Sequence, residues 1–151
     1  MIKNIIALTA IVVSAFLTVS IFAAKVATTA GTAHTKFKLI HVQELDQWIT
    51  TKTAGKPVFI FDANSDETRQ KSGLIPGAQT LASSTDYPLT LLPQDKNATL
   101  VFYCANTQCM ASHEAAKRAV NAGYKNVSVM ADGIQGWVKA GKTTQKADKS
   151  A

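Results

Sequence analysis

The chain alternates between short apolar runs and longer amphipathic stretches. Residues 58–62 (VFIFD), 99–103 (TLVFY) and 127–130 (VSVM) are short and almost continuously apolar, and residues 37–40 (FKLI) form a weaker run of the same kind. Such runs are typical of strands that are covered on both faces of a sheet. We therefore predict a strand at each of these four places.

Three other stretches have the spacing of apolar residues that favours a helix. They are residues 42–49 (VQELDQWI), 112–122 (SHEAAKRAVNA) and 134–141 (IQGWVKAG), and Gly123 is placed to end the second one. Because strands that alternate with helices are joined by crossovers, the pattern predicts an α/β fold with a mainly parallel central sheet flanked by helices.

The N-terminus has a different pattern from the rest of the chain. Lys3 precedes an uncharged, mostly apolar run at residues 5–24, and Lys25 follows it. Small residues at Ala23 and Ala24 allow cleavage of a secretory signal. A run of about 20 apolar residues is equally long enough to anchor the protein in a bilayer. Both interpretations remain open, and both predict an exported, periplasmic or otherwise extracytoplasmic protein that is soluble or tethered by its N-terminus.

Composition divides the chain into one domain and its flanks. After the signal or anchor at residues 1–24 we expect a small, polar linker at residues 25–36, a single folded domain at residues 37–141, and a flexible basic tail at residues 142–151. With 46% hydrophobic and 17% charged residues, the chain has enough apolar content for a core and is not of the disordered class.

The net charge of +6 comes from lysines that are scattered along the sequence. No arginine stripe and no interleaved aromatic residues accompany them, so we expect a solvated basic surface and no nucleic-acid partner. We expect a monomer.

The only two cysteines of the chain share one loop. Cys104 directly follows the apolar run at residues 99–103, Cys109 comes next, and a helix is predicted from Ser112. Parallel sheets bind ligands beyond the carboxyl ends of their strands, where helix N-termini present unpaired N–H groups. A thiol in that setting has a lowered pKa and is nucleophilic as its thiolate. We therefore predict that Cys104 is a catalytic nucleophile with a lowered pKa.

Several motifs together resemble the single-domain rhodanese-like (sulfurtransferase) family. They are residues 58–69 (VFIFDANSDETR), 73–78 (GLIPGA), 100–104 (LVFYC) and 122–137 (AGYKNVSVMADGIQGW), in the order and spacing of the family. The resemblance implies a small α/β domain with a parallel sheet. It also implies that Cys104 carries sulfane sulfur as a persulfide, taken from a donor such as thiosulfate and passed to an acceptor thiol or cyanide.

The resemblance also implies the roles of the neighbouring residues. The loop amides would hold the negative sulfur of the donor, as in an oxyanion hole, and Asp62 would support the structure as a hydrogen-bond acceptor. Partners would be a small sulfur donor and a thiol acceptor, either a small molecule or a protein, with no cofactor and no resident metal. The substrate-binding loop would consist of Ala105, Asn106, Thr107, Gln108, Met110 and Ala111.

Three features depart from the family pattern. Asn64 stands where many members have an arginine, and Leu74 replaces a polar residue before Ile-Pro-Gly. The cysteine loop is longer than in typical sulfurtransferases and contains no arginine or lysine, with Ala111 aligned to the position that closes the family's loop. Since a cation normally assists the binding of the thiosulfate dianion, we expect thiosulfate to be a poor donor. A phosphatase, which needs such an arginine, is disfavoured for the same reason.

Cys109 leaves three interpretations open. It is a structural disulfide partner or a small buried thiol, as is common in exported proteins; or it is a resolving thiol that attacks the sulfur on Cys104 or closes a reversible disulfide; or it joins Cys104, Met110 and His113 as a soft ligand of Cu(I). The corresponding alternative for the whole domain is a non-catalytic redox or metal-binding module that uses the same loop.

Overall fold

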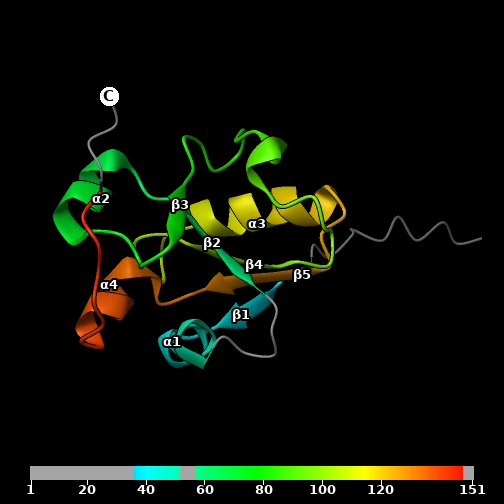
Figure 1. Cartoon of the computed structure of the whole chain (residues 1–151). Coiled ribbons are helices and arrows are strands. Elements are labelled where there is room, and N and C mark those ends of the chain that lie inside the picture. The colour runs from blue at the N-terminus through cyan, green and yellow to red at the C-terminus, as the bar shows by residue number, and fades with distance from the viewer. Residues whose placement is uncertain (1–35, 52–56, 148–151) are drawn as a thin grey trace, which may run out of the picture. The chain divides into compact units, whose positions relative to one another are not determined.

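Five strands form one parallel sheet in the computed structural model, which describes residues 36–51 and 57–147 (Figure 1). The strand order is β1-β5-β4-β2-β3, and every pair is parallel. The α/β fold with a parallel sheet and all four predicted strands are confirmed. The strands are β1 (Lys38–Ile40), β2 (Val58–Asp62), β3 (Ala78–Thr80), β4 (Thr99–Tyr103) and β5 (Asn126–Met130).

The three predicted helices are confirmed to within two residues at each end. They are α1 (Val42–Thr51), α3 (Ala111–Asn121) and α4 (Gly133–Lys139). Three further elements were not predicted: α2 (Asp66–Ser72), strand β3 and a short 3-10 turn, η2 (Leu89–Leu91). The sequence pattern misses α2 because this polar helix buries only Arg69, and it misses β3 because that strand is three residues long.

Helices cover both faces of the sheet, so that its central strands are buried (Figure 1). On one face, α3 packs its alanines against β4 and β5 around Phe102. On the other face, α1 and α4 pack against Ile60, Val101 and Met130. Burial on both faces explains why β2 and β4 read as nearly continuous apolar runs in the sequence.

The structure describes less of the chain before the predicted domain than after it. The predicted signal or anchor at residues 1–24 and nearly all of the predicted linker lie outside the described residues. Within residues 36–51 and 57–147, no helix is long and apolar enough to cross a membrane. At the other end, Gln145 pairs with Leu74, and Trp137 Nε1 donates to the carbonyl of Thr143 at 2.9 Å. Ordered contacts therefore extend beyond the predicted domain end at Gly141.

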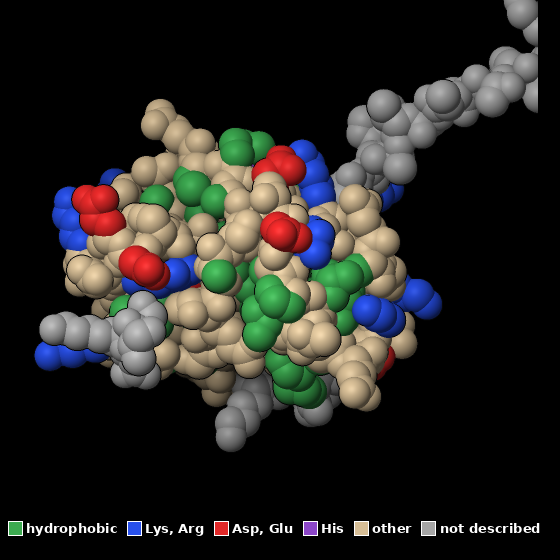
Figure 2. Space-filling view, turned by 90° about the horizontal axis from the view of Figure 1, so that it is seen from above, with side chains coloured by type: hydrophobic (Ala, Val, Ile, Leu, Met, Phe, Trp, Pro, Cys, Tyr) green, Lys and Arg blue, Asp and Glu red, His purple; other side chains and the backbone are tan. Residues whose placement is uncertain are grey.

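Figure 2 looks onto the α3 side of the domain. Acidic and basic side chains lie singly or in mixed pairs on this face, with hydrophobic side chains between them, and no stripe of one charge is visible. Mixed pairs include Lys117 with Glu114 at 2.7 Å and Arg118 with Asp86 at 3.6 Å.

Candidate functional site

The cysteine loop lies between the carboxyl end of β4 and the amino end of α3. The N-terminus of α4 holds the start of this loop in place: Ile134 N–H donates to the carbonyl of Cys104 at 2.8 Å, and Gln135 N–H donates to the carbonyl of Ala105 at 3.0 Å. Gly133 has a φ of +64°, and a Cβ there would lie 2.5 Å from the carbonyl carbon of Ala105. This glycine therefore permits both the turn and the close approach of α4 to the loop.

The two cysteine sulfurs act as caps for the first turn of α3. No side chain of the usual capping type performs this task, since the N-cap position is Met110 and its side chain makes no capping hydrogen bond. Instead, the N–H of Ala111 points to the Cys109 sulfur, and the N–H of Ser112 points to the Cys104 sulfur. Because the first N–H groups of a helix attract negative charge, this arrangement favours a thiolate at the loop.

Cys104 is the buried member of the pair, with 1% of its surface exposed. Its thiol donates to the carbonyl of Cys109 at 3.0 Å, and its Sγ atom lies 3.2 Å from Ser112 Oγ. Burial, followed by the hydrogen bond to the Cys109 side chain, raises the pKa of Cys104 even though Ser112 opposes the shift. The prediction of a lowered pKa at Cys104 is therefore wrong, because the loop gives this thiol an acceptor and removes it from water.

Cys109 is half-buried, and its sulfur receives the hydrogen bonds that had been expected at Cys104. Partial burial alone would raise the pKa of Cys109, but hydrogen bonds from the Cys104 thiol and from the N–H groups of Ala105 and Ala111 outweigh it, and the net pKa is lowered. Both cysteines are free thiols. The loop therefore holds a buried thiol whose pKa is raised and a half-buried thiol whose pKa is lowered.

The remaining loop residues include those that hold the turn between the two cysteines. Asn106 accepts from Gln108 N–H through its side chain at 3.0 Å and from Cys109 N–H through its carbonyl at 3.1 Å. Its side-chain amide also reaches Gln135 at 3.3 Å. The backbone N–H groups that are directed at a cysteine sulfur are therefore those of Ala105 in the loop and of Ala111 and Ser112 at the start of α3. Of the predicted loop residues, Thr107, Gln108 and Met110 are exposed, and Ala105, Asn106 and Ala111 are half-buried.

Asp62 lies at the end of β2, in register with Tyr103 at the end of β4, and none of its surface is exposed. Its carboxylate accepts from the Tyr103 hydroxyl at 2.7 Å and from Asn64 N–H at 2.6 Å. Arg69 lies 3.5 Å from it and also donates to the carbonyl of Leu81 at 2.8 Å. These contacts tie β2 to its neighbouring strand, to α2 and to the chain that follows β3.

Sequence reasoning missed two residues of the site and one of its supports. Ser112 was used only as the start of a helix, although a hydroxyl in the first helical turn after a cysteine is a signal for a thiol partner. Gly133 lies in the last of the family-like motifs, but the sequence does not predict its contact with the loop. Tyr103 was predicted only as part of an apolar strand. Its hydroxyl accepts a hydrogen bond from Ile75 N–H at 3.2 Å.

The copper alternative requires Cys104, Cys109, Met110 and His113 to converge on one ion. In the described part of the chain, no group of three or more His, Cys, Asp or Glu side chains is placed to hold a metal ion. The His113 ring lies edge-on against Phe37, with ring centres 5.5 Å apart, and its buried Nδ1 atom has no hydrogen-bond partner.

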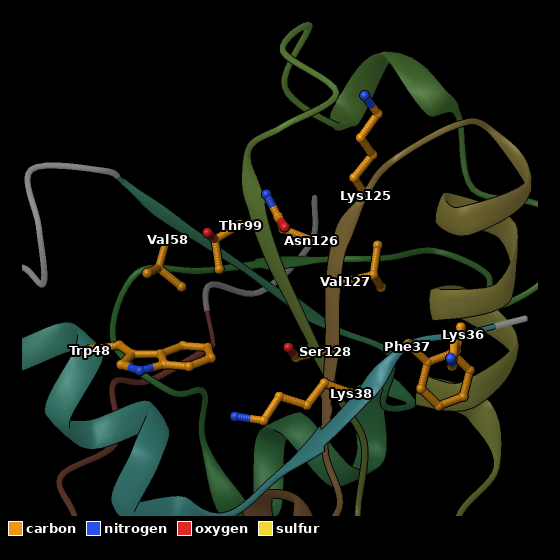
Figure 3. Close-up of a pocket in the computed structure, with 10 residues that line it drawn as sticks. All are labelled: Lys36, Phe37, Lys38, Trp48, Val58, Thr99, Lys125, Asn126, Val127 and Ser128. Carbon is orange, nitrogen blue, oxygen red and sulfur yellow. The ribbon is translucent and has the colours of Figure 1, made fainter.

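A cavity of about 680 Å³ lies at the opposite end of the sheet, where β2, β4 and β5 begin (Figure 3). Trp48 and Val58 contribute apolar walls. The amines of Lys38 and Lys125 point in different directions in Figure 3, and Lys38 is paired with Glu44 at 2.7 Å. The lysines therefore do not converge on a common anion position.

Comparison with solved structures places the fold among known domains. A Bacillus halodurans protein is 19% identical, with a TM-score of 0.60 over 72% of this chain and 77% of that one. Thiosulfate sulfurtransferase from Pseudomonas aeruginosa is 19% identical, with a TM-score of 0.59 over 74% of this chain but only 21% of that one. A Rhodopseudomonas palustris protein described as a possible tyrosine phosphatase is 22% identical, with a TM-score of 0.58 over 72% of this chain and 85% of that one.

At these identities the structural matches show the fold alone. No curated protein sequence matches the chain. The family model of the rhodanese-like domain matches residues 41–140, which include both cysteines and all four helices. The chain therefore belongs to the rhodanese-like family.

Proposed function

We propose that this domain is a sulfurtransferase that carries sulfane sulfur as a persulfide on Cys104, with Cys109 as the second thiol of the same site. The observation that carries the proposal is the pair of free thiols in one loop at the amino end of α3, where the Cys104 thiol donates to the carbonyl of Cys109 at 3.0 Å. Helix N–H groups directed at both sulfurs stabilise the anionic forms that a persulfide and its precursor require. The fold shared with the Pseudomonas thiosulfate sulfurtransferase agrees with this chemistry.

The donor we propose is a small organic persulfide rather than thiosulfate. Residues 104–112 contain no lysine or arginine. The dianion would therefore meet only amides and a hydroxyl, whereas an organic persulfide carries less charge and needs no cation. The acceptor is a thiol of a small molecule or of a protein.

Cyanolysis tests the proposal. The reduced chain is loaded with an organic persulfide, freed of excess donor and treated with cyanide, which removes a sulfane sulfur as thiocyanate. We expect about one thiocyanate per chain, and none above background from a Cys104→Ser/Cys109→Ser double variant. Equal thiocyanate from both proteins would show that the domain is not a cysteine persulfide carrier, and would favour a non-catalytic binding module.

A second candidate function is redox control of the site, favoured by the turn that brings the carbonyl of Cys109 within 3.0 Å of the Cys104 sulfur while both cysteines are free. Under oxidising conditions they would form a Cys104–Cys109 disulfide that protects the site from overoxidation. We expect its reduction potential to lie above about −300 mV, the usual ceiling for structural bridges. Redox titration with a mass readout tests this, and a thiol pair that never closes would rule it out.

We also propose that the protein acts outside the cytoplasm. This proposal rests on the apolar run at residues 5–24, preceded by Lys3. Cell fractionation with and without that segment tests it: loss of export on deletion would support it, and unchanged export would contradict it.

A further inference from the structure

The two thiols of the loop differ in how they meet solvent. Cys104 is 1% exposed, whereas Cys109 is half-buried and lies next to the exposed side chains of Gln108 and Met110. A sulfur donor that arrives from water therefore reaches the Cys109 sulfur before it reaches the Cys104 sulfur.

The two thiols also differ in their hydrogen bonding. Cys104 has an acceptor for its proton, the carbonyl of Cys109 at 3.0 Å. At Cys109, the neighbouring Cys104 thiol and the backbone N–H groups of Ala105 and Ala111 instead lower the pKa. Since the thiolate is the nucleophile, reactivity and access favour the same residue.

We propose that Cys109 is the thiol that takes sulfur from the donor, and that it passes this sulfur on to Cys104 for storage. This inference rests on the proposed sulfurtransferase function and assigns the order of its steps. In this order Cys109 has the catalytic contact with the donor, and it is more than a resolving thiol.

The first step is attack of the Cys109 thiolate on the outer sulfur of an organic persulfide, RS–SH. The S–S bond of the donor breaks, RS⁻ leaves with the bonding electron pair, and Cys109 becomes the persulfide Cys–S–SH.

The second step moves the outer sulfur from Cys109 to Cys104. The Cys104 sulfur attacks it, the bond from the sulfane sulfur to Cys109 breaks, and the proton of Cys104 passes to the departing Cys109 sulfur. Cys104 then carries the persulfide, which loses its proton to water because a persulfide is more acidic than a thiol, and Cys109 is again a thiol. No external oxidant or reductant is needed. Ser112 Oγ, 3.2 Å from Cys104 Sγ, is placed to donate to the sulfur as its charge develops.

Storage at Cys104 has a physical advantage over storage at Cys109. A persulfide at the buried position is shielded from water and from stray thiols by α3 and by the loop that α4 holds at Cys104 and Ala105. The sulfur leaves by the reverse path, through Cys109 to the acceptor thiol.

A rapid-quench loading experiment on the full-length chain tests the order. Reduced protein is mixed with cysteine persulfide as the donor and quenched with iodoacetamide at successive times, and fragment spectra then locate the extra sulfur at Cys104 or Cys109. Cys104→Ser and Cys109→Ser make the same chemical change at the two positions and form the matched pair. Circular dichroism checks that both variants are folded.

The relay predicts that the extra sulfur appears first on Cys109 and then moves to Cys104. Cys104→Ser should load Cys109 at a rate within twofold of the parent chain but retain the sulfur there. Cys109→Ser should load Cys104 at least tenfold more slowly. First appearance on Cys104, with an unchanged loading rate in Cys109→Ser, would overturn the relay and leave the proposed function intact. If neither cysteine of the parent chain gains sulfur, the proposed function fails and the relay fails with it.

Discussion

Two strand ends lie side by side at the carboxyl edge of the sheet. One carries an enclosed carboxylate, and the other leads into a partly exposed pair of thiols. Asp62 at the end of β2 and Tyr103 at the end of β4 are register partners, and Cys104 follows directly after Tyr103. Around Asp62, the Tyr103 hydroxyl and the Asn64 N–H both donate to the carboxylate, which has no exposed surface. At the cysteines, the buried Cys104 thiol donates to the carbonyl of Cys109 at 3.0 Å, and Cys109 itself is only partly buried.

The difference between these two centres lies in what each can exchange. The Asp62 centre is fully enclosed, and Tyr103 has its pKa raised by burial and by the Asp62 charge, so it keeps its proton. A centre of this kind fixes strands and loops in place but offers nothing to a solute. The thiol pair can exchange a proton, a sulfur atom or two electrons, because one of its members faces solvent. We therefore assign support to the first centre and chemistry to the second.

Removal of the Asp62 carboxylate should have the largest effect. Asp62→Ala leaves Arg69 without its buried counter-ion and Tyr103 without its acceptor, so we expect the free energy of unfolding to fall by about 3–5 kcal/mol. Urea denaturation measures this. Asp66→Ala is the matched control, since its exposed carboxylate pairs with the same arginine at 2.7 Å and should contribute less than about 1 kcal/mol. Equal losses in the free energy of unfolding for Asp62→Ala and Asp66→Ala would contradict the supporting role that we assign to the Asp62 centre.

A change at the support of the cysteine loop should have the next largest effect. Gly133→Ala adds a Cβ 2.5 Å from Ala105 backbone in the left-handed region, and we expect a loss of about 2–4 kcal/mol together with slower sulfur loading. Gly77→Ala is the control, because Gly77 has a φ of +79° but no atom within 4 Å of the added Cβ. It should show only the backbone strain and unchanged loading. Unchanged loading in Gly133→Ala would contradict the role of α4 in placing the loop.

The sequence predicts the strands that position this site but not the pKa values of its two thiols. The runs VFIFD and TLVFY predict buried parallel strands, and therefore place Asp62 and Cys104 at one edge. Short elements escape prediction, because AQT in β3 is three residues long and largely exposed. The sequence also does not predict which cysteine has the raised pKa and which the lowered one. This depends on a turn that brings the Cys109 carbonyl to the Cys104 thiol, and on a helix that starts at Ala111 rather than at the predicted Ser112.

A cation placed at the loop should produce a moderate gain. Ala111→Arg puts a guanidinium at the first residue of α3, beside the Cys109 sulfur that the Ala111 N–H already contacts. A charge-assisted hydrogen bond of about 1.5–3 kcal/mol, reduced by the helix dipole, should raise kcat/KM for thiosulfate about tenfold. Steady-state sulfite release measures this, with Ala111→Gln as the uncharged control. An equal gain from glutamine, or a parent chain that already prefers thiosulfate, would contradict our account of the missing charge.

The smallest expected effect concerns the single hydrogen bond between the two thiols. Because Cys109 has the lowered pKa and Cys104 the raised one, iodoacetamide should modify Cys109 first, and its rate should rise with pH at values below the ordinary thiol pKa of about 8.5. Cys104→Ala removes the donor, so the pKa of Cys109 should rise and its alkylation at pH 7 should slow by about threefold. Cys104→Ser keeps a hydroxyl donor and should slow it less. Mass spectrometry of the alkylated chain across pH distinguishes the sites. Faster labelling of Cys104, or identical Cys109 profiles in all three proteins, would show that the thiol pair shares no proton and that the two strand ends differ only in exposure.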